Sequence, residues 1–251
     1  MKEYVHYSQR IGITEAGEPA FNLDLFEHLY EGNIIITKRL TNKLIDKLLE
    51  NKERIILHLT CTGHGGTILE PLVPTAEKTH EQLKKLLEGG FPVKQVVLRI
   101  DPILPTVEGR HIAYNVAKLF SDCGIKRLRF SVLDMYKHVK ERFEKANYSI
   151  PYTSFHASNT ARQTVLRGLN AIADKYGYTI EACAEPGIES CPCLSQKDIV
   201  LLGLSEKIKL YSSAQQRKNC KCPVNKSELI KKGKPHRCEN ACLYCFWKDE
   251  G

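Results

Sequence analysis

Short apolar runs alternate with longer amphipathic segments along most of the chain, starting near residue 34. The apolar runs over residues 34–37, 54–60, 95–101, 127–133 and 178–184 have the length and aliphatic content of buried strands. Because these strands alternate with amphipathic segments, the pattern predicts repeated β/α units around a parallel sheet.

The amphipathic segments have recognisable ends, since Thr, Ser and Asp cap helix starts and Gly closes helix ends. Four helices are predicted: Thr75 to Glu88, closed by Gly89-Gly90; residues 109–123, closed by Gly124; Asp134, as the cap, to Ala146; and Ser158 to Tyr176, closed by Gly177.

The periodic pattern gives way beyond Cys191 to turn-forming and polar residues. We therefore expect one integrated α/β domain. Residues 1–190 are predicted to form an incomplete or permuted parallel (β/α) barrel, and residues 191–251 a cysteine-rich segment that wraps over one end and closes the barrel mouth. Reactive groups in such folds gather at the carboxyl ends of the strands, so a site is expected there.

The chain has 251 residues, of which 42% are hydrophobic, enough for one sizeable core. No stretch approaches the roughly 18 consecutive apolar residues of a membrane span, and the opening residues lack the apolar segment of a signal peptide. The sequence thus predicts a cytoplasmic protein without a membrane partner and leaves the oligomeric state open.

The formal net charge is +8, from 37 Lys and Arg against 29 Asp and Glu. This excess favours a polyanionic partner such as DNA or RNA. Basic residues are dense before the last cysteines: Arg217, Lys218, Lys221, Lys226, Lys231, Lys232 and Lys234. They either line a groove for a nucleic-acid backbone or form a solvated charged face.

Ten cysteines occur in the chain. In a reducing cytosol they are metal ligands, core residues or reactive thiols rather than disulfides. Cys61 and Cys123 stand in apolar contexts and are interpreted as packing residues, whereas the other eight cluster late in the sequence.

The most specific motif is Cys238-Glu-Asn-Ala-Cys242-Leu-Tyr-Cys245. Three thiolates can ligate three irons of a 4Fe-4S cluster and leave one iron for a substrate or cofactor, whereas an electron carrier normally fills all four positions with cysteine. Two alternatives stay open, a tetrahedral Cys3His zinc site completed by His236 and a set of unligated thiols.

Polar residues stand at the ends of three predicted strands. Arg99 and Asp101 interrupt an apolar run and face the same side of the strand. They either contact a ligand or form a structural ion pair, because buried charges are usually paired. Ser131 and Glu185 occupy the ends of the next two strands, and Asp134 has an adequate role as a helix cap.

A glycine-rich turn, Cys61-Thr-Gly-His64-Gly65-Gly66, follows the strand over residues 54–60. Its glycines allow a ligand to approach the backbone closely, and His64 can titrate near neutral pH as a proton donor or acceptor. The turn lacks the Lys-Ser/Thr ending of a phosphate-binding loop.

Several segments match one known pattern: Ser8-x-Arg10, Pro19-Ala-Phe21, Thr62-Gly63, Leu69-Glu70-Pro71, Arg99-x-Asp101-Pro102, Ser131-x-x-Asp134-x-Tyr136, Gln216-Arg217 and the cysteine triad. Together they resemble a poorly characterised family related to radical S-adenosylmethionine (SAM) enzymes, in which the cluster motif lies at the C-terminus. The resemblance covers almost the whole chain. It extends more distantly to spore photoproduct lyase, a radical SAM enzyme that repairs a thymine dimer.

The resemblance implies a barrel of radical SAM type, a 4Fe-4S cluster on the triad, SAM on the open iron, and an electron donor such as a flavodoxin or ferredoxin. In that family an electron from the cluster cleaves SAM to a 5'-deoxyadenosyl radical. The expected SAM contacts are Tyr244 on the adenine, Arg99, Ser131, Gly65 and Gly66. The residues expected to contact substrate or move protons are His64, Asp101 and Glu185.

The terminal position of the motif departs from ordinary radical SAM proteins, where the cysteine loop follows the first strand, and implies a permuted arrangement. The cysteines that fall where members of the family carry them are Cys183, Cys193, Cys220 and Cys222. Four thiolates suit a second iron-sulfur cluster or a structural zinc. Cys191 can replace Cys193 in this set.

The favoured function is a radical SAM enzyme of isomerase or lyase type that rearranges or repairs a nucleic-acid base, such as a modified thymidine in DNA. The alternatives are a radical SAM enzyme acting on a small metabolite and a zinc-stabilised, non-catalytic nucleic-acid-binding protein.

Overall fold

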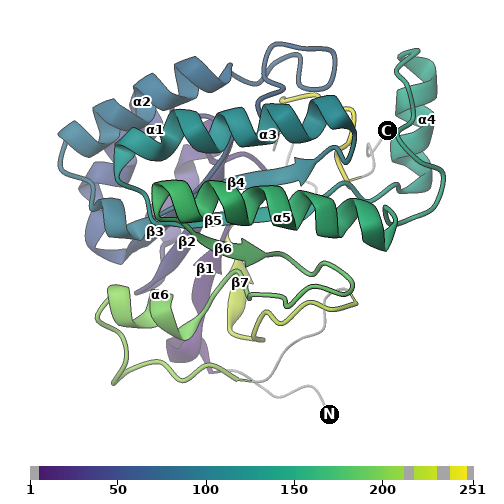
Figure 1. Cartoon of the computed structure of the whole chain (residues 1–251). Helices are drawn as coiled ribbons and strands as arrows, with labels where there is room; N and C mark the ends of the chain where they lie inside the picture. Colours follow the sequence, from purple (N-terminus) through teal and green to yellow (C-terminus); the bar gives the residue numbers. More distant parts are fainter. Residues whose placement is uncertain (1–5, 212–217, 231–237, 248–251) are drawn as a thin grey trace.

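The computed structural model describes residues 6–211, 218–230 and 238–247, and its centre is a sheet of seven parallel strands (Figure 1). The order across the sheet is β6-β5-β4-β3-β2-β1-β7. The strands are β1 (Ile11–Ile13), β2 (Asn33–Thr37), β3 (Ile55–Thr60), β4 (Val96–Ile103), β5 (Arg127–Val132), β6 (Thr179–Ala182) and β7 (Lys226–Glu228).

The sheet is open rather than closed into a barrel. β6 and β7 are its edge strands, and no pairing between them joins the described residues into a ring. The α/β class and the parallel sheet are confirmed, whereas the predicted incomplete or permuted barrel is not, because the described strands form an open sheet. Because β1 to β6 lie side by side in chain order, right-handed crossovers put the connecting helices on one face of the sheet. The opposite face is called the inner face below.

The helices are α1 (Asn42–Glu50), α2 (Ala76–Glu88), α3 (Val107–Leu119), α4 (Lys137–Lys145), α5 (Asn159–Tyr176) and α6 (Gln196–Leu201). Predicted caps are confirmed at α2 and α5. The side chain of Thr75 accepts a hydrogen bond from the N–H of Lys78, and that of Ser158 accepts one from the N–H of Ala161. Gly177 closes α5 in the left-handed conformation.

Helix α4 starts later than predicted. Its N-cap is Tyr136, so the cap assigned to Asp134 is wrong. The Asp134 carboxylate lies 2.8 Å from Nδ1 of His156, and the N–H of Met135 donates to the carbonyl of Phe155 at 2.7 Å. These contacts pair Asp134 and Met135 with residues 155–156, and the extended backbone of Tyr136 places the start of the helix after it.

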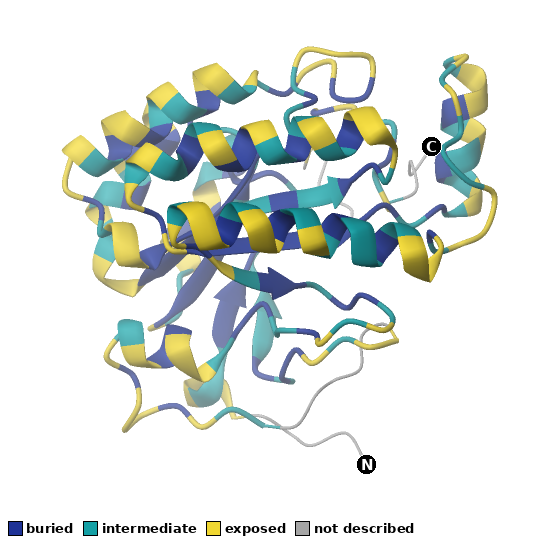
Figure 2. Ribbon diagram, viewed as in Figure 1, coloured by how far each residue is buried: buried dark blue, intermediate teal, exposed yellow. Residues whose placement is uncertain are grey.

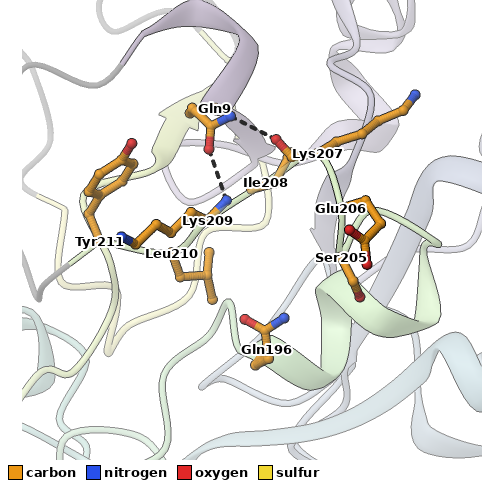
Figure 3. Close-up of a pocket in the computed structure, with 9 residues that line it drawn as sticks. All are labelled: Gln9, Gln196, Ser205, Glu206, Lys207, Ile208, Lys209, Leu210 and Tyr211. Carbon is orange, nitrogen blue, oxygen red and sulfur yellow. Dashed lines mark hydrogen bonds between the residues drawn. The ribbon is translucent and has the colours of Figure 1, made fainter.

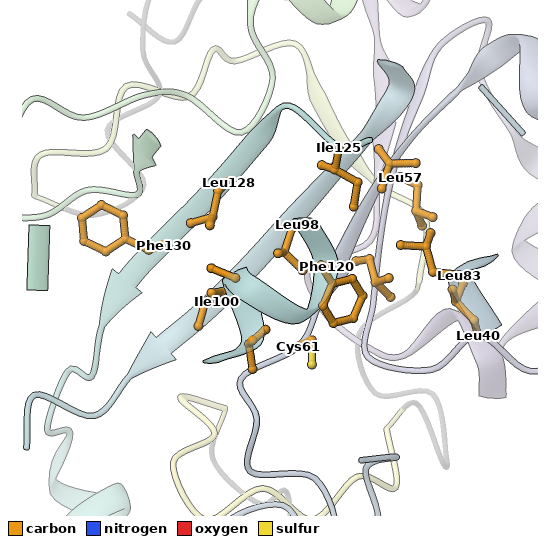
Figure 4. Packing of buried hydrophobic residues seen from close by; sticks show 14 of the residues in the cluster. Leu40, Leu57, Cys61, Leu83, Leu98, Ile100, Phe120, Ile125, Leu128 and Phe130 are labelled. Carbon is orange, nitrogen blue, oxygen red and sulfur yellow. The ribbon is translucent and has the colours of Figure 1, made fainter. Parts of the chain in front are cut away.

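The outer face of the sheet packs against α1, α2, α3 and α5. Leu98, Phe120, Leu128 and Phe130 belong to the continuous apolar cluster between these layers (Figure 4). The helices turn buried stripes toward the sheet and exposed stripes toward solvent (Figure 2). This amphipathic pattern is what made the helices predictable.

The amino half of the inner face is covered by the tail that follows β6. Tail residues Leu194, Ile199, Leu204 and Ile208 pack against Ile11, Ile13, Ile34, Ile56 and Val97 of the first four strands. Residues 238–247 lie instead at the carboxyl ends of the strands, where the N–H of Leu243 donates to the carbonyl of Leu69 at 3.0 Å. The tail therefore divides between the two ends of the strands instead of covering one end as predicted.

Candidate functional site

The triad loop, residues 238–247, is attached to side chains that follow β1 and β2. Asn240, near the start of this loop, is buried. Its side-chain oxygen accepts a hydrogen bond from Nε of Arg39 at 2.9 Å, and its amide nitrogen donates to Glu18 at 3.3 Å. Because Arg39 follows β2 and Glu18 follows β1, the loop is fixed to the carboxyl ends of two neighbouring strands.

Glu18 is a buried carboxylate that ties these segments together. It accepts hydrogen bonds from the hydroxyl of Thr37, from the N–H of Lys38 at 2.9 Å and from the N–H of Ala20 at 3.2 Å. Burial raises the pKa of Glu18, and these hydrogen bonds partly oppose the rise. Its many donors fix the carboxylate against which Asn240 is placed.

Tyr244 belongs to the triad loop and is buried where this loop meets the segment after the glycine-rich turn. Its hydroxyl donates to Glu70 and accepts a hydrogen bond from Nζ of Lys38 at 2.9 Å. Glu70 also pairs with Lys38 and accepts from the hydroxyl of Thr62 at 2.6 Å. Burial favours the protonated form of Glu70, but Lys38 holds the pKa of this carboxyl below its ordinary value. A charged, buried pair thus anchors the residue next to the third cysteine.

The opposite end of the loop is held by α4. The guanidinium group of Arg142 donates to the carbonyl of Cys245 at 2.6 Å and to that of Trp247 at 2.7 Å. The indole N–H of Trp247 donates to the carbonyl of Glu15 at 3.2 Å. The loop therefore has contacts to α4 on one side and to the segment after β1 on the other.

The three thiols influence one another. Cys238 is exposed, and Cys242 and Cys245 are partly buried. Burial raises the pKa of Cys242 to about 12; Lys38 opposes the rise, while Cys245 and Cys238 add to it. The Cys242 thiol therefore keeps its proton at neutral pH unless a metal ion displaces it. Soft thiolate ligands of this kind fit iron in an iron-sulfur cluster or zinc.

The spacing of the triad bears on which metal fits. In the part of the chain that the structure describes, these three sulfurs do not all lie within 4.8 Å of one another. A single zinc ion at about 2.3 Å from each sulfur would bring them to about 3.8 Å apart. In a 4Fe-4S cluster each cysteine binds a different iron, which allows wider spacing. His236, the fourth ligand of the zinc alternative, lies outside the described residues.

The glycines after β3 are required by the turn itself. A Cβ atom at Gly65 would collide with the carbonyl of Pro74, and Gly66 has a φ of 77°. His64 is buried beside them, and burial lowers the pKa of its imidazole, which is therefore neutral at pH 7. Contacts of these residues with SAM or substrate stay predictions.

The polar residues at the ends of β4 and β5 do meet. Arg99 and Ser131 both hydrogen-bond to Asp101, so the interpretation of Arg99 and Asp101 as an ion pair is confirmed. Glu185 is buried, and its carboxylate accepts a hydrogen bond from the N–H of Val132 at 2.8 Å. Their assigned roles toward SAM and substrate stay predictions.

The cysteines predicted for a second metal site gather on the inner face. The thiol of Cys193 is hydrogen-bonded to those of Cys183 and Cys222, and Cys222 is also bonded to Cys220. The structure thus brings together four residues that stand up to 39 positions apart in the sequence. Among these described residues no three sulfurs all lie within 4.8 Å of one another, so their spacing, like that of the triad, fits a 4Fe-4S cluster better than a single zinc ion. The alternative ligand, Cys191, uses its carbonyl to accept a hydrogen bond from Arg129 at 3.0 Å.

A different group has its potential ligand atoms closest together. Within the described residues, His80, Asp122 and Cys123 are the set whose atoms all lie within 4.8 Å of one another. Asp122 is already paired with Lys84 and His80, each at 2.7 Å. A half-exposed carboxylate with a lysine partner is a surface ion-pair cluster rather than a metal site.

A pocket of about 440 Å³ lies beside α6, lined by Gln9, Gln196 and residues 205–211 (Figure 3). The side chain of Gln9 is hydrogen-bonded to the segment that forms one wall of the pocket (Figure 3). Nε2 of Gln9 donates to the carbonyl of Lys207 at 2.7 Å, and its Oε1 accepts from the N–H of Lys209 at 2.9 Å. None of the cysteines lines this pocket, so it does not belong to the candidate site.

The predicted basic groove is described only in part. Lys218 and Lys221 are exposed, as a nucleic-acid contact requires. Lys226 is not, because its side chain is 3% exposed and its ammonium group pairs with Glu15 at 2.6 Å. The residues of the predicted groove that lie outside the described ones are Arg217, Lys231, Lys232 and Lys234, and Gln216 of the matched motif lies there too.

Sequence reasoning missed four residues that organise these sites: Glu18, Lys38, Asn240 and Arg129. Glu18, Lys38 and Asn240 stand in loops, where a polar residue is unremarkable. Arg129 carried a usable signal, because Arg127 and Arg129 alternate with apolar residues in β5 just as Arg99 and Asp101 do in β4.

An open parallel sheet with a cysteine-rich loop at its carboxyl end defines an α/β protein with a candidate metal-binding site. Residues 28–247 match the family described as Domain of unknown function (DUF1848), and the chain belongs to this family. The match includes both groups of cysteines and all strands except β1. No curated protein matches the chain. None of the helices in the described residues has the length and apolarity to cross a membrane.

Proposed function

We propose that this chain is a radical SAM enzyme of isomerase or lyase type. The observation that carries the proposal is the triad loop, in which three thiols near enough to affect one another's ionisation are fixed at the carboxyl ends of parallel strands. When bound, a 4Fe-4S cluster on three cysteines with SAM at its open iron would supply a 5'-deoxyadenosyl radical, which abstracts hydrogen from a substrate.

The chain's own contribution would be to fix the loop and exclude water. Cys238, Cys242 and Cys245 would hold the iron. The Lys38–Glu70 pair is hydrogen-bonded to the hydroxyl of Tyr244, so the ring of Tyr244 has a fixed position in the triad loop. A residue held in this way can contact the adenine of SAM without further ordering.

Two further groups have proposed roles toward SAM and substrate. Arg99 would bind the carboxylate of SAM, with Asp101 and Ser131 orienting its guanidinium group. His64, neutral at pH 7, and the buried Glu185 would accept or deliver protons, and Asp101 would contact substrate. Gly65 and Gly66 would allow SAM to approach the turn closely.

For the substrate we favour a nucleic-acid base, such as a modified thymidine in DNA. The net charge of +8 and the exposed Lys218 and Lys221 support this choice, because contacts to phosphate depend on surface cations. An enzyme acting on a base inside a duplex must extrude it. The proposal includes a cytoplasmic location and a flavodoxin or ferredoxin as electron donor.

The test is anaerobic reconstitution with iron and sulfide, followed by addition of dithionite and SAM. We expect a brown protein that produces 5'-deoxyadenosine, measured by chromatography, and a loss of at least about 100-fold in this product for Cys242→Ala, since three cysteines are required to hold the cluster. The matched control is Cys123→Ser, which removes a partly buried thiol outside the loop and leaves product formation unchanged.

Equal product formation by Cys242→Ala and wild type would contradict the proposal. A colourless protein that contains stoichiometric zinc and binds DNA without cleaving SAM would favour the zinc-stabilised binding protein. Product formation without a response to DNA or RNA would favour a small metabolite as substrate.

A further inference from the structure

A second group of thiols is assembled on the inner face by parts of the chain that are far apart in sequence. Cys183 directly follows β6, Cys193 begins the tail, and Cys220 and Cys222 precede β7. β6 and β7 are opposite edge strands of the sheet. The thiols therefore meet only when the tail has crossed the inner face, which makes their convergence a property of the fold and not of a local motif.

Backbone groups of the same segments are directed at the sulfurs. The N–H of Cys193 donates to Sγ of Cys222 at 3.1 Å, and the N–H of Cys222 donates to Sγ of Cys220 at 3.5 Å. Hydrogen bonds of this kind favour a negatively charged sulfur. The loops thus present donors to the form of the thiol that binds metal.

Arg129 is hydrogen-bonded to the turn that carries Cys193. Its side chain is fully buried, donates to the carbonyls of Cys191 and Pro192 at 3.0 and 2.8 Å, and places Nη1 3.7 Å from Sγ of Cys193. Arg99 is its direct neighbour across the β4–β5 pairing. Two guanidinium groups thus stand side by side next to the thiols.

These cations already have carboxylate partners. Arg129 pairs with Glu181, Arg99 with Asp101, and Arg127 with Asp198 as well as Glu181. Three carboxylates therefore balance three guanidinium groups. Because the neighbouring guanidinium groups are already paired, thiolates at this site would need a cation among the sulfurs to balance their charge.

Several buried nitrogen atoms near the thiols lack a hydrogen-bond partner among the described residues. Both ring nitrogens of His58 are buried without a hydrogen bond, and the same holds for Nε of Arg99 and Nε of Arg129. His58 faces inward from β3, fully buried, close enough to Cys193 and both arginines to interact electrostatically with them. Each unsatisfied buried group destabilises the folded state, and an anionic centre near the N–H groups among these atoms would reduce that cost.

We propose that Cys183, Cys193, Cys220 and Cys222 hold a metal centre through four thiolates, either a 4Fe-4S cluster or a zinc ion. Four cysteine ligands leave no open coordination position, so this centre would not bind SAM. It is separate from the triad and does not depend on the function proposed for it. Its role is structural if the metal is zinc, and structural or electron-carrying if it is a cluster.

The test compares the metal content of three variants purified without oxygen. The triad variant, Cys238→Ala/Cys242→Ala/Cys245→Ala, removes the triad, and the inner-thiol variant, Cys193→Ser/Cys222→Ser, removes two of the four inner thiols. Cys123→Ser is the matched control. Iron, sulfide and zinc are counted per chain. We expect the triad variant to retain either about four irons with four sulfides or about one zinc. The inner-thiol variant is expected to lose that same amount, and the control to match wild type.

A triad variant without metal, or an inner-thiol variant with as much metal as wild type, would overturn the proposal. Should the inner-thiol variant fail to fold, alkylation of the triad variant decides. Cys220 is partly exposed, so a free Cys220 thiol would react with iodoacetamide at once. If the Cys220 thiol reacts only after a chelator is added, the result supports the metal centre. Immediate reaction of this thiol without a chelator rules the centre out. Failure of the wild-type protein to cleave SAM while it contains the inner centre would count against the proposed function alone.

Discussion

At the scale of single residues, the hydroxyl of Tyr244 shows how a buried polar atom fixes the triad loop. It bridges Glu70 and Lys38, while the ring packs in an apolar cluster that includes Leu69 and Leu104. Tyr244→Phe keeps the ring and removes the bridge. We expect a loss of about 1–2 kcal/mol in the free energy of unfolding, because the Lys38–Glu70 pair loses a buried hydrogen-bonding partner.

Urea unfolding of the two proteins measures this loss. The control is Tyr7→Phe, at a side chain that is 68% exposed, where the change should stay within about 0.5 kcal/mol. Equal stability of Tyr244→Phe and wild type would show that the hydroxyl contributes nothing to the attachment of the loop.

Among the polar site residues, those that interrupt an apolar strand were predictable from the sequence. Arg99 and Asp101 stand out for that reason, and the structure pairs them. Glu18 and Asn240 could not be found in this way, because their contact joins positions 222 residues apart and nothing in either local sequence indicates it. Asp134 was misassigned because its partner, His156, stands in a later loop.

At the scale of elements, one carboxylate joins β5 to β6. Glu181 on β6 pairs with Arg127 at 2.7 Å and with Arg129 at 2.5 Å, both on β5. Arg127 also pairs with Asp198 on α6, at 2.6 Å. Glu181→Gln leaves Arg129 buried without a carboxylate partner. We expect a loss of about 3 kcal/mol in unfolding free energy, because a buried charge would be left unpaired.

Chemical denaturation at pH 7 tests this expectation against Glu189→Gln. Glu189 is 90% exposed and lies 3.9 Å from Lys221, so its replacement should change stability by less than about 0.5 kcal/mol. If both variants unfold like wild type, the buried network does not hold β5, β6 and α6 together.

The elements that sequence predicted best are those that bury a long apolar face. Strands β2 to β6 and helices α2, α3 and α5 follow the expected pattern within a few residues. β1 and β7, with three residues each, are too short for alternation to be recognised. Helix α6 packs on the inner face, so its position depends on strands far earlier in the chain, among them β5, whose Arg127 pairs with Asp198 of α6 across 71 positions.

At the scale of the whole molecule, Glu228 joins the last strand to the segment after the first. Its carboxylate accepts hydrogen bonds from the N–H groups of Glu15 at 2.8 Å and Ala16 at 3.1 Å. Burial raises the pKa of Glu228 above its ordinary value of 4.5; the backbone donors oppose the rise, and the Glu15 carboxylate adds to it. The folded state therefore binds this proton more tightly than the unfolded chain does.

The stability contributed by that proton is fully present below pH 4.5 and is lost as pH rises through the folded-state pKa. Glu228→Gln cannot ionise. We therefore expect the stability difference between wild type and Glu228→Gln to shift in favour of the variant as pH rises from 4.5 toward neutrality. Urea unfolding of both proteins across this range measures the difference, and a constant difference would contradict the raised pKa.

The covering of the inner face by the tail also constrains the order in which the molecule can fold during synthesis. The isoleucines of β1, β2 and β3 on the inner face are covered by residues that leave the ribosome more than 130 positions after them. Until then the nascent chain presents an uncovered apolar surface. Both groups of cysteines fall in or after this covering segment, so neither group can be assembled until late in synthesis.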